Sequence, residues 1–158
     1  MIRRTLLSIG TTALLCLGAV VPASAQSLKE KVVGAYILES GSENYADGKK
    51  LSSWATGNLI LDATGHMSQF LIGKERGKTS DSVRMPVGPA VAYYGTYTVD
   101  EAASTIILKI ESGVTPVFDG TARSVKISIK GDILTFTSPE VKTPEGMMIP
   151  VNEWKKLK

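Results

Sequence analysis

The chain has 158 residues with one Cys and one His, and its formal charge is +3 from 18 basic and 15 acidic residues. Two such residues cannot build a Cys/His metal cluster, and one Cys cannot build a disulfide framework. The charge is too small and too mixed to indicate a nucleic-acid partner by itself. The length predicts one domain, large enough for a packed core.

The first 25 residues have the pattern of a secretory signal peptide. Arg3 and Arg4 form a positive start, an apolar stretch follows, and small residues end it at Ala25. We expect cleavage there, which leaves residues 26–158 as one mature domain in the periplasm or outside the cell. The alternative is an uncleaved anchor, but the apolar stretch is short for a membrane span of roughly 20 residues. The export route, general or twin-arginine, stays open.

Cleavage would change the composition of the domain. It removes Arg3, Arg4 and Cys16, so 16 basic and 15 acidic residues remain, for a net charge of +1 and no thiol. The mature domain must then be stabilised by its core rather than by disulfides. It lacks the charge typical of a nucleic-acid-binding protein. The sequence also has no phosphate-binding Gly loop, nucleophile elbow or metal-ligand spacing, so it predicts no cofactor, metal or catalytic residue.

After a helical turn within 27–33, the sequence alternates with period two and is cut by turn residues at short intervals. This pattern is typical of short β-strands. Pro150 indicates that the last strand lies at a sheet edge or carries a bulge. The stretch 73–90 has no pattern and predicts a loop, either functional or a plain connection. The predicted strands are 33–39, 54–62, 66–72, 91–99, 105–111, 121–130, 133–137 and 147–157.

About eight strands that follow one another in sequence predict an all-β, antiparallel up-and-down barrel, because closure removes the exposed sheet edges. A β-sandwich is the alternative. The interior of an eight-stranded barrel is either filled by side chains or open to one small ligand.

Five segments, in order, resemble the bacterial lipocalin-like domain family of calycin-type β-barrels. One departure is Tyr36, where the family usually has Trp. The resemblance implies a closed barrel with a cavity, and it does not imply a single function, since relatives bind small apolar molecules or shape a reactive ligand. The matching segments are 33–36, 57–68, 94–101, the pair of 120–123 and 131–137, and the closing strand with Trp154.

Tyr36 and Arg123 are the first candidate pair. An aromatic on the first strand and an arginine on a late strand can stack at one end of a barrel as a structural floor, and such a cation–π contact contributes about 0.5–2 kcal/mol. Alternatively, Arg123 faces the cavity and binds a ligand carboxylate through its two-pronged guanidinium.

Further candidates for the ligand-binding wall are aromatic or polar residues expected to face inward. Tyr93 and Tyr97 share one strand face with Gly95 between them, which would leave room for a ligand or a neighbouring ring. Plain core packing is the alternative for both tyrosines. The set of predicted ligand-binding residues is Tyr93, Tyr97, Gln69, Arg123, Trp54, Phe136 and Trp154.

His66 is the only side chain that normally titrates near neutral pH. Because its neighbours Met67 and Leu71 are expected to point inward, His66 should point to solvent. A catalytic base needs burial and an oriented partner, and none is visible nearby.

The sequence therefore favours an exported module that binds a small, mostly apolar molecule. A cyclase or isomerase in which the cavity orients the substrate is the alternative, and a structural barrel with a filled interior is a third. The oligomeric state is left open. A drug-sized ligand needs a cavity of roughly 300 Å³ or more, so a smaller interior would argue against both ligand-based functions.

Overall fold

The computed structural model describes residues 26–76 and 88–158. The predicted signal peptide and the middle of the predicted loop lie outside the described residues. In chain order the elements are α1 (Leu28–Val32), β1 (Gly34–Tyr45), β2 (Lys50–Leu51), β3 (Trp54–Leu61), β4 (His66–Gly73), β5 (Ala90–Asp100), β6 (Thr105–Gly113), the 3₁₀ helix η1 (Pro116–Phe118), β7 (Ala122–Lys130), β8 (Ile133–Thr137), β9 (Val141–Thr143) and β10 (Gly146–Lys156).

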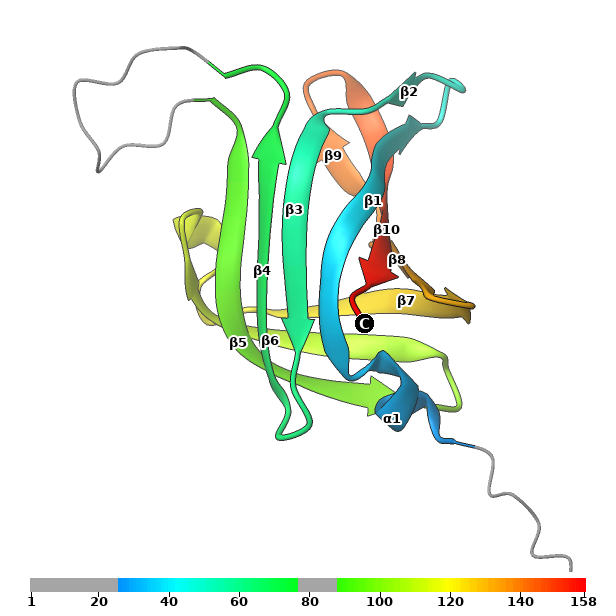
Figure 1. Cartoon of the computed structure of the whole chain (residues 1–158). Helices are drawn as coiled ribbons and strands as arrows, with labels where there is room; N and C mark the ends of the chain where they lie inside the picture. The colour runs from blue at the N-terminus through cyan, green and yellow to red at the C-terminus, as the bar shows by residue number, and fades with distance from the viewer. Residues whose placement is uncertain (1–25, 77–87) are drawn as a thin grey trace, which may run out of the picture.

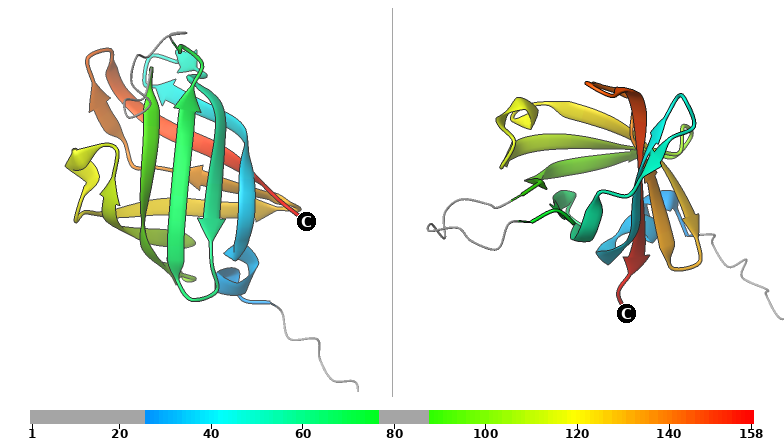
Figure 2. Two further views of the ribbon diagram at one scale, coloured as in Figure 1. Left: turned by 60° about the vertical axis from the view of Figure 1, so that its left-hand side comes forward. Right: turned by 90° about the horizontal axis from the view of Figure 1, so that it is seen from above.

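The strands form a closed antiparallel up-and-down barrel of eight strands, in the order β1-β3-β4-β5-β6-β7-β8-β10. Pairing between β1 and β10 closes it, with Leu38 opposite Trp154. The predicted barrel is confirmed, and the sandwich alternative does not apply. The short strands β2 and β9 lie at the end of the barrel opposite α1 (Figure 1; Figure 2, left). We call the two ends the α1 end and the β9 end.

The last strand differs from the prediction. Because β10 pairs with β1 on one side and with β8 and β9 on the other, it is not an edge strand. Pairing with β9 ends at Met148, and pairing with β8 begins at Val151. Pro150 therefore lies in the gap between two partner strands, where a missing N–H breaks no ladder hydrogen bond on that side. The bulge lies elsewhere, in β1 between Leu38 and Ser40.

The helix α1 covers one end of the barrel. A capping box holds its start, since the Ser27 hydroxyl accepts from the N–H of Glu30 and the Glu30 carboxylate accepts from the N–H of Ser27. Its last residue, Val32, is fully buried, and its carbonyl accepts a 2.7 Å hydrogen bond from the Tyr36 hydroxyl. Lys156 donates to the carbonyl of Lys31 at 3.0 Å. These contacts fix α1 against the first and last strands.

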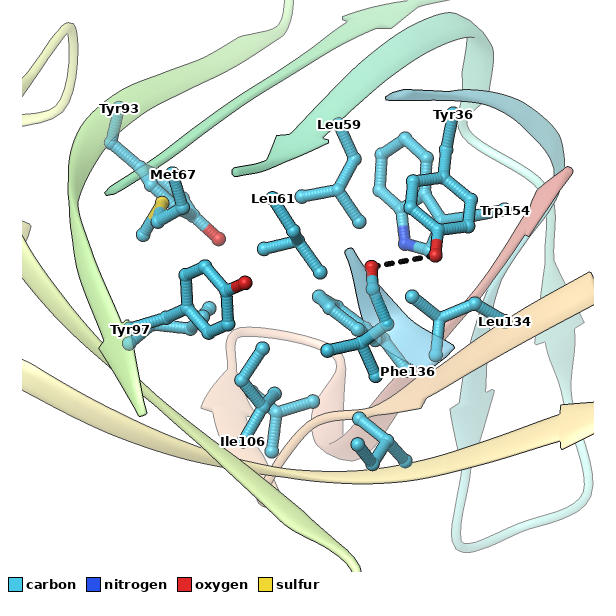
Figure 3. Close-up of a cluster of buried hydrophobic side chains, with 14 of the residues drawn as sticks. Tyr36, Leu59, Leu61, Met67, Tyr93, Tyr97, Ile106, Leu134, Phe136 and Trp154 are labelled. Carbon is cyan, nitrogen blue, oxygen red and sulfur yellow. Dashed lines mark hydrogen bonds between the residues drawn. The ribbon is translucent and has the colours of Figure 1, made fainter. Parts of the chain in front are cut away.

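Period-two alternation along the strands builds the core, because inward residues come from every second position. Leu59 and Leu61 of β3 and Ile106 and Leu108 of β6 are almost completely buried. Each such side chain contributes about 1.5–3 kcal/mol by its removal from water. Figure 3 shows this cluster, with the hydrogen bond of the Tyr36 hydroxyl drawn as a dashed line.

Gly95 has a different role from the one the sequence suggested. A Cβ at this position would clash with the backbone carbonyl of Lys109 on β6. The register of β5 with β6 also shifts between Tyr94 and Gly95. Gly95 therefore allows two backbones to approach closely at a bulge, and the space its missing side chain leaves is occupied by β6 rather than by a ligand.

No helix within the described ranges is long and apolar enough to cross a membrane.

Candidate functional site

A cavity of about 170 Å³ remains inside the barrel at the β9 end. All eight barrel strands contribute to its wall, together with η1, β9 and the residue after β8. The lining residues are Glu43, Trp54, Gln69, Leu71, Val91, Tyr93, Leu108, Phe118, Arg123, Val125, Phe136, Ser138, Val141, Met148, Pro150 and Asn152.

The volume of this cavity limits what it could hold. A cavity of about 170 Å³ is smaller than the roughly 300 Å³ that a drug-sized ligand needs. By the criterion set from the sequence, this argues against both ligand-based functions for a drug-sized molecule. An apolar cavity of roughly 150 Å³ is nevertheless enough to bind benzene. The space therefore suits a molecule of about one ring, and nothing much larger.

Five of the seven residues predicted for the wall line this cavity: Trp54, Gln69, Tyr93, Arg123 and Phe136. They come from β3, β4, β5, β7 and β8, so the barrel brings together side chains that are far apart in sequence. Inward alternation along each strand is the reason that the sequence could identify them.

Tyr97 and Trp154 do not line the cavity, which corrects their prediction. Tyr97 lies four residues beyond Tyr93, or about 13 Å further along β5 toward the α1 end. There its hydroxyl donates a 2.7 Å hydrogen bond to the carbonyl of Asp62. Trp154 is fully buried and packs edge-on against Phe136, with 6.4 Å between ring centroids. Alternation predicted the correct face for both residues, but not their depth in the barrel.

The predicted floor pair of Tyr36 and Arg123 is wrong. Arg123 lies near the start of β7, at the β9 end, where its guanidinium stacks on Phe118 with 4.9 Å between Cζ and the ring centroid. Tyr36 lies at the α1 end, where the ammonium of Lys156 is 5.8 Å from its ring centroid. The two residues belong to opposite ends of the barrel because β1 and β7 enter it from opposite sides. Arg123 instead takes the second predicted position, in the cavity wall.

Three side chains form a continuous stack at the wall. The ring of Tyr93 meets the ring of Phe118 edge-on at 6.1 Å, and Phe118 carries Arg123 on its face. Phe118 belongs to η1, which lies between the predicted strands 105–111 and 121–130, so its role was missed. Stacking on an aromatic ring holds a guanidinium in place while leaving its N–H groups at the ring edge available.

Gln69 and Tyr93 are two of the predicted wall residues that carry polar groups. Both are buried, and each is about 6% exposed. Burial raises the pKa of the Tyr93 hydroxyl, although the nearby charge of Arg123 and the side chain of Gln69 partly counter this. The hydroxyl is therefore protonated at neutral pH. It can donate or accept a hydrogen bond, but it cannot serve as a ready base.

Asn152 is a wall residue that the sequence analysis missed. It is 7% exposed, and its side-chain oxygen has no hydrogen-bond partner among the described residues. This oxygen lies over Gly41 and beside Trp54, since a Cβ on Gly41 would be 3.0 Å from the oxygen and 2.7 Å from the Trp54 ring. The signal that could have found it is the alternation on β10, which turns Asn152 inward together with Trp154.

A larger hollow of about 620 Å³ lies at the α1 end, between α1 and the β7–β8 hairpin. It is an open cleft beside the core, and two of the side chains around it already donate to backbone carbonyls. Tyr36 donates to Val32, and Lys156 donates to the carbonyl of Lys31. We therefore place the candidate site in the smaller, more enclosed lumen at the β9 end.

His66 lies outside both hollows, as predicted. Its side chain is 68% exposed, and its Nδ1 lies 2.8 Å from the Thr64 hydroxyl and 3.8 Å from the Asp62 carboxylate. These are contacts within a turn. Hydrogen bonds from the Thr64 side chain and from the backbone hold the pKa of Asp62 below its usual range.

No protein-family model matches the chain, and no curated protein matches its sequence. Fold and site together define a closed antiparallel up-and-down barrel of lipocalin-like fold, with a small lumen at one end. Membership of the bacterial lipocalin-like family stays a prediction from the sequence resemblance.

Proposed function

We propose that this chain is an exported barrel protein that binds one small, mostly apolar molecule, about the size of benzene, in the cavity at the β9 end. The observation that carries the proposal is the unfilled lumen, about 170 Å³ in volume, whose wall is built from side chains of all eight barrel strands. Close-packed interiors contain few voids larger than a water molecule.

The wall combines apolar and polar side chains. Leu71, Val91, Leu108, Val125 and Phe136 supply apolar surface, and a few polar side chains lie among them. This combination is typical of small-molecule sites, where apolar surface supplies affinity and a few polar groups supply orientation.

Export to the periplasm or the medium is proposed from the signal-like residues 1–25. The test is the N-terminal residue of the protein isolated from a producing cell. A chain that begins at Gln26 supports export and cleavage, and a chain that still begins at Met1 contradicts them.

The binding proposal is tested with neutral probes that match the cavity, namely benzene and toluene. Both should raise the melting temperature of the mature chain, because a ligand of the folded state stabilises it by mass action. Val125→Phe fills the cavity and should abolish the shift, since Val125 is a buried residue of the wall. Val117→Phe makes the same change on the surface and serves as the control.

If benzene and toluene raise the melting temperature of neither the mature chain nor the Val117→Phe control, the lumen is not a binding site. The structural-barrel alternative is then favoured. Small molecules that copurify with the protein are identified by extraction and mass spectrometry. Recovery of an added compound in chemically altered form would favour the enzyme alternative.

A further inference from the structure

We propose that the cavity at the β9 end is specific for a compact monocarboxylic acid that also carries a hydroxyl or amino group. Arg123 binds the carboxylate, and the side-chain oxygen of Asn152 accepts a hydrogen bond from the second group. This inference rests on the proposed function, because it names the class of molecule that the same cavity holds.

Arg123 supplies the anion-binding part of the site. Its guanidinium stacks on Phe118 at 4.9 Å, and within residues 26–76 and 88–158 no carboxylate pairs with it. A guanidinium at a cavity wall with no partner is a strong recognition element for a carboxylate, which it binds through two parallel hydrogen bonds. The stack restricts the side chain before the ligand arrives, so less conformational entropy is lost on binding.

Asn152 supplies the second part. Its side chain is more than nine-tenths buried, and its oxygen lacks a hydrogen-bond partner within the described ranges. A buried acceptor without a partner destabilises the protein, and native structures seldom retain one without a reason. This oxygen now packs against Gly41 and Trp54 with almost no accessible surface, so the amide must turn toward the cavity before an O–H or N–H group of a ligand can donate to it.

The placement of the two residues sets the shape of the ligand. Arg123 lies on β7 and Asn152 on β10, with β8 between these strands. Val125 follows Arg123 on the same inward face, and Phe136 is the register partner of Asn152. Apolar surface therefore separates the two polar groups. A ligand that reaches both needs an apolar body, such as one ring, between its carboxylate and its donor group.

Glu43 limits the charge of the ligand. It also lines the cavity, and its carboxylate would repel a second negative group in so small a space. A dicarboxylate is thus disfavoured, whereas a hydroxyl or an amino group is compatible with Glu43. One negative charge together with one hydrogen-bond donor is the combination that these three side chains accept.

The test compares probes built on a single benzene ring, namely benzene, phenol, benzoate, 3-hydroxybenzoate and 4-hydroxybenzoate. Dissociation constants for the mature chain are measured at neutral pH by NMR titration. At least one hydroxybenzoate should bind at least tenfold more tightly than both phenol and benzoate. A charge-paired contact also weakens with salt, so raising the ionic strength should weaken the hydroxybenzoates and leave phenol unchanged.

Variants separate the two contacts. Arg123→Gln should weaken hydroxybenzoate and benzoate at least tenfold and leave phenol unchanged. Lys126→Gln, which removes a positive charge from the exposed face of the same strand, should leave all five probes unchanged. Arg123→Lys keeps the charge without the two-pronged geometry, and should give an intermediate loss even if the Gln variant fails to fold.

Asn152→Leu should reduce the affinity for hydroxybenzoate to that for benzoate, while the affinity for benzoate does not fall. Asn58→Leu makes the same substitution in β3 outside this cavity wall, and should change neither.

The outcomes distinguish this inference from the proposed function. If benzene and phenol bind as tightly as the hydroxybenzoates, the cavity is a site for neutral molecules. The proposed function then stands and this inference is wrong. If Asn152→Leu weakens benzoate and hydroxybenzoate equally, Asn152 does not read a donor group and the inference is also wrong. If none of the probes binds, both proposals fail.

Discussion

The two ends of the barrel share the same strands and the same alternation, yet they are built differently. At the α1 end, Tyr36, Leu61 and Trp154 are almost completely buried, and the hydroxyls of Tyr36 and Tyr97 donate to backbone carbonyls, while the indole N–H of Trp154 has no partner among the described residues. At the β9 end, a cavity remains and the buried oxygen of Asn152 has no partner in the described part of the chain. The comparison teaches that one barrel can keep its stability at one end and its recognition groups at the other.

The largest effect is expected from Trp154→Ala at the filled end. The indole is fully buried, so its removal should lower the free energy of unfolding by about 3–5 kcal/mol, through lost burial and the new void. Urea denaturation of the purified chain measures the change. Trp54→Ala at the β9 end is the matched control, and it should cost clearly less because Trp54 is only partly buried. Equal costs would show that the two ends do not differ in packing.

At the β9 end, a substitution should raise the free energy of unfolding rather than lower it. Asn152→Leu replaces an unpartnered amide by an apolar side chain of similar shape, and without ligand it should raise the free energy of unfolding by about 1–3 kcal/mol. The same denaturation experiment measures it. A gain in stability together with lost affinity for the hydroxybenzoates would be a trade of stability for function. A loss of stability would mean that the fold itself needs this amide.

Removal of the Tyr36 hydroxyl tests how α1 is held. Tyr36→Phe leaves the carbonyl of Val32 without its 2.7 Å partner, and should cost about 1 kcal/mol in denaturation. Proteolysis near α1 should also become faster. Tyr97→Phe is the parallel change at the Asp62 carbonyl. If Tyr36→Phe leaves both readouts unchanged, the hydroxyl does not hold α1.

The raised pKa of Tyr36 also predicts that the folded state loses stability at alkaline pH. Burial, with a smaller contribution from Tyr97, raises the pKa of Tyr36 from 10.0 to about 12. The folded state thus favours the neutral phenol, and this stabilisation is complete below pH 10 and is lost as the pH rises toward 12. Ultraviolet titration should show a phenolate that forms near pH 12 and disappears in Tyr36→Phe. A titration curve unchanged by this substitution would refute the assignment.

The smallest effect concerns Asp62 in the β3–β4 turn. Its pKa lies below the ordinary value of 3.8, chiefly because the Thr64 side chain donates to its carboxylate. Its contribution to stability is therefore present above pH 3.8 and is lost as the pH falls through the lower folded-state pKa. Asp62→Asn should flatten this part of the stability profile. An unchanged acid profile would show that the turn contributes nothing to it.

Much of the barrel could be predicted from the sequence because alternation reports which face of a strand is buried. It placed Tyr93 inside, where this side chain is 6% exposed. It could not report depth along the barrel axis, since residues two or four apart share a face at different levels. This is why Tyr97 and Trp154 were assigned to a cavity that they do not reach, and why Arg123 was paired with Tyr36.

Segments without a periodic pattern were the other source of error. The strand β9 and the helix η1 both lie between predicted strands, where the sequence predicted no element. Both contribute to the cavity through Val141 and Phe118. Their conformations depend on pairing with β10 and on packing against Tyr93, which are contacts between distant parts of the chain.

The sequence by itself determined the class of fold and the inward faces of its strands, because period-two alternation is a local property of the chain. Only the tertiary structure decided that the α1 end is filled, that about 170 Å³ remains at the β9 end, and that Asn152 has no partner there among the described residues. The cavity volume and the hydrogen-bond partners of buried groups depend on how eight strands stagger around a common axis. That stagger is set by all their pairings together and is encoded in no single segment.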